Sequence, residues 1–197
     1  MRTSVRGTRI RLASRCGGED FDLKKSRAMP EQNRFLALLR QALENVREER
    51  FFQDERGFQG ALLQELSQRL AHGAFPGDPI IEQEYQKRLP LHKIRIRPDI
   101  IIHVPFERGV TEERYEGNFV AIELKRRATA KRAKEAFANL AQMKKALKYP
   151  LTIFINIDSE QTHAARCPKS ISGQTACFAV RFEEGRSVVR LEEHDQR

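Results

Sequence analysis

The sequence predicts a single α/β domain in which a mixed β-sheet is flanked by helices. Three observations carry this prediction. The chain has 197 residues, 40% of them hydrophobic, which is enough to bury one good core. Its apolar residues repeat first at helical and then at strand spacing. The resulting order is two helices, three strands, one helix and three strands, which is typical of a mixed sheet with helices on each side.

The N-terminal part of the chain is predicted to be a basic tail followed by two helices. Residues 1–28 lack any apolar period and are rich in Arg, Ser and Gly, so we expect a disordered tail and a single domain over residues 29–197. Whether the natural protein begins at Met29 is left open. Apolar residues at spacings of three and four predict one helix over 30–51 and another over about 54–72.

Extended segments follow the glycine- and proline-rich loop after the second helix. The predicted strands cover residues 80–89, 92–104, 118–125, 151–158, 176–183 and 186–192, and one helix covers residues 129–149. Glu184 and Gly185 are expected to form the turn of a C-terminal hairpin. Pro98 has no backbone N–H, so it must lie at an edge, a bulge or a bend of its strand.

The excess of positive over negative charge is confined to two segments of the chain. The formal net charge is +9, and residues 1–28 contribute +5 while residues 123–148 contribute +7; all other residues sum to −3. Localised positive charge of this kind is typical of a protein that binds a polyanion, most commonly nucleic acid. The alternative for each segment is a solvated helix face or a solubilising tail.

Cysteine usage and hydropathy indicate a cytoplasmic protein. The three cysteines form an odd count without CxxC spacing, which favours unpaired thiols in a reducing compartment over a disulfide framework or a zinc site. No stretch of 18 apolar residues is present, so we expect no membrane partner.

Two carboxylates and a lysine lie at the ends of neighbouring predicted strands. Three isoleucines directly follow Asp99, and an apolar strand leads to Glu123. Alternation of side chains places Phe119, Glu123 and Lys125 on one face of their strand. Two carboxylates close together in a core repel each other unless a cation lies between them. Oxygen ligands of this type suit Mg²⁺ or Mn²⁺, so the pattern indicates a divalent metal site.

These residues resemble the PD-(D/E)XK nuclease superfamily. Pro98-Asp99 is the only P-D dipeptide of the chain, and Glu123-Leu124-Lys125 is its only E-x-K triplet. The resemblance implies a restriction-endonuclease-like αβββαβ core and metal-dependent hydrolysis of phosphodiester bonds. It implies that Asp99, Glu123 and the backbone carbonyl of Leu124 hold Mg²⁺, with Mn²⁺ as the alternative. Lys125 would orient and activate the attacking water.

Members of this superfamily often add an acid from the helix that precedes the sheet. Glu65, one position from the apolar stripe of the second predicted helix, is the residue we assign to this catalytic role; the alternative is a solvated helix residue. Glu84 on the first predicted strand is a second candidate. Its alternative explanation is a cross-strand partner for Lys87 or Arg95.

Polar residues around the motif are candidates for nucleic-acid contact, because phosphates are bound by Arg, Lys and helix N-termini. The candidates for nucleic-acid contact are Arg95, Arg97, Arg126, Arg127, Lys131, Lys134, Gln142 and Lys145.

Some superfamily members carry a tyrosine four positions from a glutamine in the helix after the motif. This chain has Gln142 but lacks that tyrosine, so it departs from the exonuclease-type version of the superfamily.

The expected function is therefore Mg²⁺-dependent hydrolysis of DNA, as an endonuclease. A catalytically inactive nucleic-acid-binding module on the same fold is the main alternative, because a fold does not determine a function. A protein-interaction subunit is the third. Whether the chain acts on DNA or RNA, and whether it works as a homodimer or in a larger complex, is left open.

Overall fold

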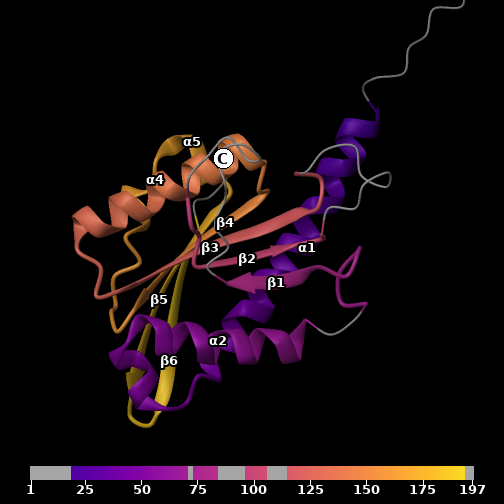
Figure 1. Ribbon diagram of the computed structural model, residues 1–197. Coiled ribbons are helices and arrows are strands. Elements are labelled where there is room, and N and C mark those ends of the chain that lie inside the picture. Colours follow the sequence, from indigo (N-terminus) through magenta and orange to yellow (C-terminus); the bar gives the residue numbers. More distant parts are fainter. Residues whose placement is uncertain (1–18, 71–72, 84–95, 106–114, 194–197) are drawn as a thin grey trace, which may run out of the picture.

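The computed structural model describes residues 19–70, 73–83, 96–105 and 115–193, with side chains from residue 30 onward. A six-stranded open sheet has α1 and α2 on one face and α4 and α5 on the other (Figure 1). The elements are α1 (Glu19–Glu44), η1 (Glu49–Gln53), α2 (Glu55–Arg69), β1 (Ile80–Gln83), β2 (Ile100–His103), β3 (Asn118–Arg126), α4 (Ala130–Leu147), β4 (Leu151–Ile157), η2 (Ala164–Arg166), α5 (Lys169–Ser172), β5 (Thr175–Glu183) and β6 (Arg186–Glu193). The predicted α/β class with a mixed, helix-flanked sheet is confirmed. The restriction-endonuclease-like identity of this core stays a prediction.

The strands follow the order of the chain across the sheet. β1, β2 and β3 are antiparallel neighbours, β3, β4 and β5 run parallel, and β6 returns antiparallel to β5. α4 forms the crossover between β3 and β4, because parallel neighbours need a connection that returns to the same end of the sheet. The start of β2 therefore lies beside the end of β3, and this is where the site is found.

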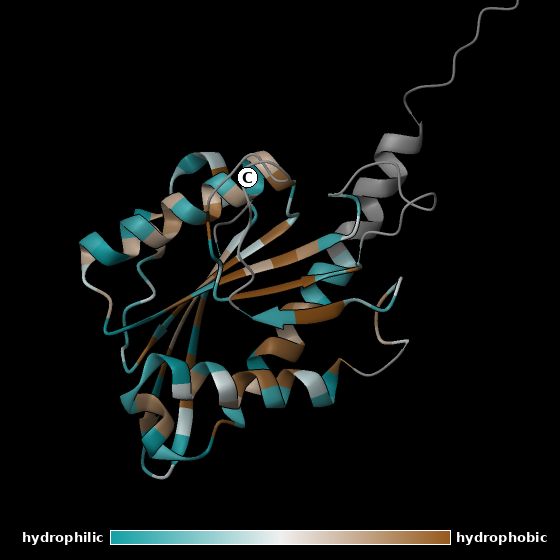
Figure 2. Ribbon diagram, in the orientation of Figure 1, coloured by the Kyte–Doolittle hydropathy of each residue, from teal (hydrophilic) through white to brown (hydrophobic). Residues whose placement is uncertain are grey.

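Two apolar cores lie on the two faces of the sheet. Val120, Ile122 and Leu124 of β3 belong to the core under α1 and α2, whereas Ala121 belongs to the core under α4. Figure 2 shows the apolar strands in brown between helices with mixed colouring. By the same alternation Glu123 and Lys125 lie on the α4 face of β3.

A β-bulge near the start of β3 interrupts this alternation. The register pairs Ile102 with Val120 but His103 with Asn118, so Phe119 is the extra residue. Its ring packs 5.6 Å from that of Phe35 in α1. The prediction that Phe119 shares a face with Glu123 is therefore wrong, because the bulge turns it toward α1.

The helices next to the site begin at side-chain caps. Asp54 Oδ2 accepts a 2.7 Å hydrogen bond from Gly57 N at the start of α2, and Thr129 Oγ1 accepts one from Arg132 N at 3.3 Å at the start of α4. Such caps satisfy N–H groups that have no partner within the helix. Both helices present their N-terminal ends near the C-terminal end of β3, where their dipoles favour negative charge.

The structure differs from the predicted elements in three places. α1 begins at Glu19, within the segment assigned to the tail, and ends at Glu44; the tail prediction for residues 1–18 lies outside the described residues. β2 begins only at Ile100, because Pro98 cannot donate a ladder hydrogen bond. η1, η2 and α5 were not predicted, since single helical turns carry too few residues to show a period. The C-terminal hairpin is confirmed.

The described part of the chain contains two of the three cysteines. Cys167 and Cys177 are free, which confirms the prediction of unpaired thiols for these two. Both thiols are buried, and burial raises their pKa. Cys16 lies outside the described residues. Among the described helices, none combines the length and the apolar character needed to cross a membrane.

Candidate active site

Asp99, Glu123 and Lys125 are brought together at one end of the sheet. Ile100 pairs with Ile122, and the same register continued by one place sets Asp99 opposite Glu123. Lys125 Nζ lies 3.2 Å from Asp99 Oδ2 and 3.6 Å from Glu123 Oε2. Two buried strands thus position two acids and one ammonium group within direct reach of each other.

The backbone of Leu124 completes this group. Its N–H donates a 2.7 Å hydrogen bond to Asp99 Oδ2, which ties the start of β2 to the end of β3. Its carbonyl oxygen accepts a short hydrogen bond from Lys125 Nζ. The predicted set of two carboxylates, one carbonyl and one lysine is therefore found at a single place.

Glu55 supplies a third carboxylate, which was not predicted from the sequence. Its Oε1 lies 3.4 Å from Lys125 Nζ, and its Oε2 accepts a 3.0 Å hydrogen bond from Arg126 N. Arg132 of α4 lies 3.4 Å from the same Oε2. An acid in the first turn of a helix is ordinary, because it interacts favourably with the helix dipole. The sequence feature that points to Glu55 is its position seven residues before the buried Leu62, on the stripe of α2 that faces the core.

Glu65, to which we assigned this role, does not reach the site. Its carboxylate pairs with Arg69 at 2.5 Å on the same helix. Glu65 also lies ten residues after Glu55, which corresponds to about 15 Å along α2. Glu55 takes the place predicted for Glu65, and the alternative candidate Glu84 lies outside the described residues.

The contrast between these two acids gives a direct test. We expect Glu55→Gln to weaken Mg²⁺ binding by about 10- to 100-fold, because it removes a charge that stands beside the proposed ligands and orients Lys125. Glu65→Gln is the same change on the same helix and is expected to alter binding by less than about twofold. Titration calorimetry with MgCl₂ measures both. Equal effects of the two variants would contradict the assignment of Glu55.

Gln59 holds the backbone of Asp99 in place. This side chain is buried, lies one helical turn after Glu55, and its Nε2 donates a 2.7 Å hydrogen bond to the Asp99 carbonyl oxygen. That carbonyl follows Pro98 and precedes the first residue of β2, where the ladder has not yet begun. A polar residue on the buried stripe of α2 was the signal that the sequence offered.

We expect Gln59→Leu to lower the free energy of unfolding by about 1–3 kcal/mol, because it leaves a buried carbonyl without its donor. For the cleavage that the motif predicts, it should also lower the rate more than the substrate affinity, since Asp99 loses its fixed position. Gln64→Leu, at an exposed position of the same helix, is the matched control. Urea unfolding and steady-state kinetics measure the two effects. A loss of stability with unchanged kcat would show that Gln59 is structural only.

Burial dominates the electrostatics of Glu123. Its side chain is 3% exposed, and this burial, with the nearby charge of Asp99, raises its pKa to about 8. Lys125 and Asn139 act in the opposite direction but do not cancel the effect. Without a further cation, Glu123 is therefore largely protonated at neutral pH.

Asp99 and Lys125 respond to the same surroundings in opposite ways. Burial raises the pKa of Asp99, although Lys125 and the Leu124 N–H act against it. Burial alone would lower the pKa of Lys125, but the charges of Asp99, Glu123 and Glu55 outweigh it and raise the pKa above its ordinary value. Lys125 thus stays protonated and acts as the counter-ion of Asp99 and Glu55, and also of Glu123 when Glu123 is ionised.

The donor atoms of this site fit a hard divalent cation. Glu123 Oε1 is buried and has no hydrogen-bond partner, and such an orphaned acceptor calls for an explanation. Two carboxylates and one carbonyl are ligands of the kind that Mg²⁺ binds together with water. No cluster of three His, Cys, Asp or Glu side chains in the described part of the chain forms a metal site by itself. Binding would therefore require the Leu124 carbonyl and a shift of Lys125 away from it.

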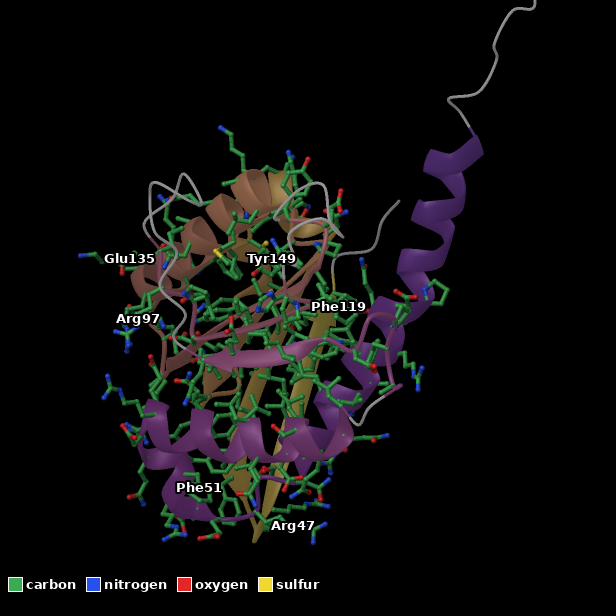
Figure 3. All side chains as sticks on the ribbon, turned by 45° about the vertical axis from the view of Figure 1, so that its right-hand side comes forward. Arg47, Phe51, Arg97, Phe119, Glu135 and Tyr149 are labelled. Atoms are coloured by element: carbon green, nitrogen blue, oxygen red, sulfur yellow. The ribbon has the colours of Figure 1, made fainter. Side chains whose placement is uncertain are left out.

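The predicted nucleic-acid contacts divide into two groups. Lys131, Lys134, Gln142 and Lys145 are exposed on α4, and Arg97 is exposed just before Pro98, with its side chain directed outward (Figure 3). The four α4 positions are exposed to solvent, where a ligand can reach them. Arg95 lies outside the described residues.

Arg126 and Arg127 are held by protein groups instead. The guanidinium of Arg126 donates to Phe52 O at 2.7 Å and to Asp158 Oδ2 at 2.7 Å, so it ties η1 and β4 to the end of β3. Arg127 pairs with the same carboxylate at 2.7 Å but remains 67% exposed. Arg126 therefore has a structural role in place of the predicted contact, while Arg127 can still meet a phosphate.

Comparison of the chain with protein-family models found no match, and comparison with curated proteins found no significant similarity.

Proposed function

We propose that this chain is a metal-dependent nuclease that hydrolyses phosphodiester bonds of DNA on a restriction-endonuclease-like core. The observation that carries the proposal is the convergence of Asp99, Glu123, the Leu124 carbonyl and Lys125, with Glu123 Oε1 buried and unpaired. A purely structural ion-pair network is a weak explanation for this group, because buried ion pairs rarely stabilise a fold more than apolar residues of the same size. A site that binds a cation and an anionic substrate explains the same charges directly.

Each residue has a defined part in this proposal. Asp99, Glu123 and the Leu124 carbonyl would hold Mg²⁺, with Mn²⁺ as the alternative. When bound, the metal would stabilise negative charge on the phosphate and lower the pKa of the attacking water. Lys125 is protonated, so it donates a hydrogen bond to that water or to a phosphate oxygen and does not act as the base. Glu55 keeps Lys125 and the backbone at Arg126 in position.

The first experiment is digestion of a supercoiled plasmid. With Mg²⁺ the protein is expected to nick or linearise the DNA, whereas EDTA or Asp99→Ala should abolish cleavage. The runner-up function is a catalytically inactive DNA-binding module on the same fold, which the exposed lysines of α4 favour. Retention of DNA in a gel without cleavage in either metal would select this second function.

The exposed lysines of α4 make the DNA contact testable by its salt dependence. Lys131, Lys134 and Lys145 lie on a helix of 18 residues, about 27 Å long, that begins directly after the β3 motif. We expect replacement of all three by Gln to weaken DNA binding equally for unrelated sequences and to reduce the slope of log K against log salt by about 3. Lys169→Gln in α5 is the single-site control, and fluorescence anisotropy at several salt concentrations measures the slope. An unchanged slope would place the DNA elsewhere.

A further inference from the structure

The outer edge of β6 is a long strand without a neighbour. In the described part of the chain β6 spans Arg186–Glu193 and pairs with β5 alone, at the end of the sheet. The opposite edge strand, β1, comprises Ile80–Gln83 among the residues that the structure describes. An unpaired edge presents N–H and C=O groups that can bind a further strand, and proteins usually shorten or block such edges.

The hairpin geometry defines which backbone groups face this edge. Glu184 and Gly185 have φ values of 50° and 80°, as in a type I′ turn, so Arg186 is the residue that hydrogen-bonds back to Glu183. Bonding directions alternate along an antiparallel strand. The outward-facing backbone groups are therefore those of Ser187, Val189, Leu191 and Glu193.

Charge is distributed unevenly along β6. Its first half borders a groove of about 600 Å³, and Arg47, in the segment between α1 and η1, lies beside this end of the strand (Figure 3). The second half carries Glu192 and Glu193 together with Arg190, which pairs with Glu192 on the same strand, so it is acidic by one net charge. An antiparallel strand of the same sequence would place its acidic half against this groove. The residues that line the groove are Arg40, Glu44, Arg47, Gly185, Arg186, Ser187, Val188 and Val189.

We propose that β6 pairs antiparallel with β6 of a second copy of this chain, around a twofold axis at Val189. In this register Arg186 lies opposite the partner's Glu192, and the twofold axis repeats this pair on the other side of Val189. Ser187 lies opposite the partner's Leu191. It joins only outward-facing backbone groups, as the alternation requires. A shift by two residues would set Arg190 against its own copy, and a shift by one would oppose side chains that point to different faces. Charge and side-chain direction together select the register.

The proposed dimer has a consequence for the basic surface. Because the twofold axis runs perpendicular to the joined sheet, both α4 helices lie on the same face of the dimer. The pairing itself does not depend on the proposed nuclease function. A failure of either proposal therefore leaves the other standing.

The test is sedimentation equilibrium of the full chain with charge-exchanged variants. We expect a dimer for the unmodified protein, and at least about a tenfold increase in the dimer Kd for Arg186→Glu or for Glu192→Arg, because each opposes like charges. The double variant R186E/E192R should restore dimerisation. Glu192 also accepts a 2.6 Å hydrogen bond from Thr162, but the double variant lacks this bond as well, so its recovery cannot come from Thr162. Arg166→Glu in η2 is the control for net charge.

Hydrogen exchange provides a second measurement that needs no substitution. The amides of Val189 and Leu191 should become protected as protein concentration rises, whereas those of Val188 and Arg190 should be protected at all concentrations because they already bond to β5. A monomer without concentration-dependent protection would overturn the proposal. A dimer whose Kd is unaffected by both charge reversals would overturn it equally.

Discussion

Lys125→Met is expected to reduce DNA cleavage by about 10³-fold, the size of effect seen when a charge that stabilises a transition state is removed. The ammonium group lies within 3.6 Å of carboxylate oxygens of Asp99, Glu123 and Glu55. It is thus the only group in this set of four side chains that can offset negative charge on the reacting phosphate. Steady-state cleavage of a fluorescent DNA substrate measures the loss.

The same substitution should destabilise the metal-free protein. Methionine leaves the carboxylates of Asp99 and Glu55 without their counter-ion, and removal of one partner from a buried ion-pair network costs about 3–5 kcal/mol. Mg²⁺ should recover part of this loss, because a ligand that binds only the folded state stabilises it. We therefore expect the rise in Tm on addition of Mg²⁺ to be larger for Lys125→Met than for the unmodified protein.

Lys169→Met is the matched control, because Lys169 is an exposed lysine of α5 outside the proposed DNA-binding surface. This variant should keep its Tm and lose little activity. If Lys125→Met cleaved DNA as fast as Lys169→Met, Lys125 would have no catalytic role. If Mg²⁺ changed neither Tm, the charged group would be a structural network.

The part of the site that lies on strands was predictable from the sequence, since alternation and burial operate over neighbouring residues. Asp99 stands directly before an apolar run, and Glu123 and Lys125 stand at the end of another. Two antiparallel strands must bring such positions together. The order of the main elements followed for the same reason.

The residues that reach the site from helices were not predictable in this way. Glu55 and Gln59 arrive from α2, and the angle at which a helix crosses a sheet is not encoded in its own period. Glu65 fitted the same amphipathic pattern as Glu55, and only the packing of α2 distinguishes them. Phe119 shows the same limit in a strand, because one extra residue at a bulge reverses its side. Sequence patterns therefore located the motif, and tertiary packing chose its partners.

Glu123→Gln is expected to have opposite effects on activity and on metal-free stability. Activity should fall by about 10³-fold, because glutamine cannot replace an anionic metal ligand. Stability should rise at alkaline pH, because the substitution removes a carboxylate whose burial raises its pKa to about 8. Opposite signs of this kind are typical of a residue retained for function at the expense of the fold.

The direction of the pH dependence follows from linkage. The pKa of Glu123 is higher in the folded than in the unfolded chain, so the folded state binds this proton more tightly. The contribution of Glu123 to stability is therefore full below its ordinary pKa near 4.5 and is lost as the pH rises toward 8. Relative to Glu123→Gln, the unmodified protein should be equally stable at pH 5 and less stable by about 2–4 kcal/mol at pH 9.

Urea unfolding of both proteins at pH 5, 7 and 9, with and without Mg²⁺, tests this difference. Asp99 and Lys125 also titrate, but both residues are present in both proteins. The difference in stability between the two proteins therefore reports the ionisation of Glu123 together with its interactions with Asp99 and Lys125. Mg²⁺ should remove the deficit of the unmodified protein at pH 9 and leave the variant unchanged, because the cation would bind the ionised carboxylate of Glu123 and compensate for its burial. Glu135→Gln, on the exposed face of α4, should show neither effect (Figure 3). A deficit that persisted in Mg²⁺ would mean that the buried oxygen of Glu123 does not bind the ion, and the metal site would then have to be assigned to Asp99 and Glu55.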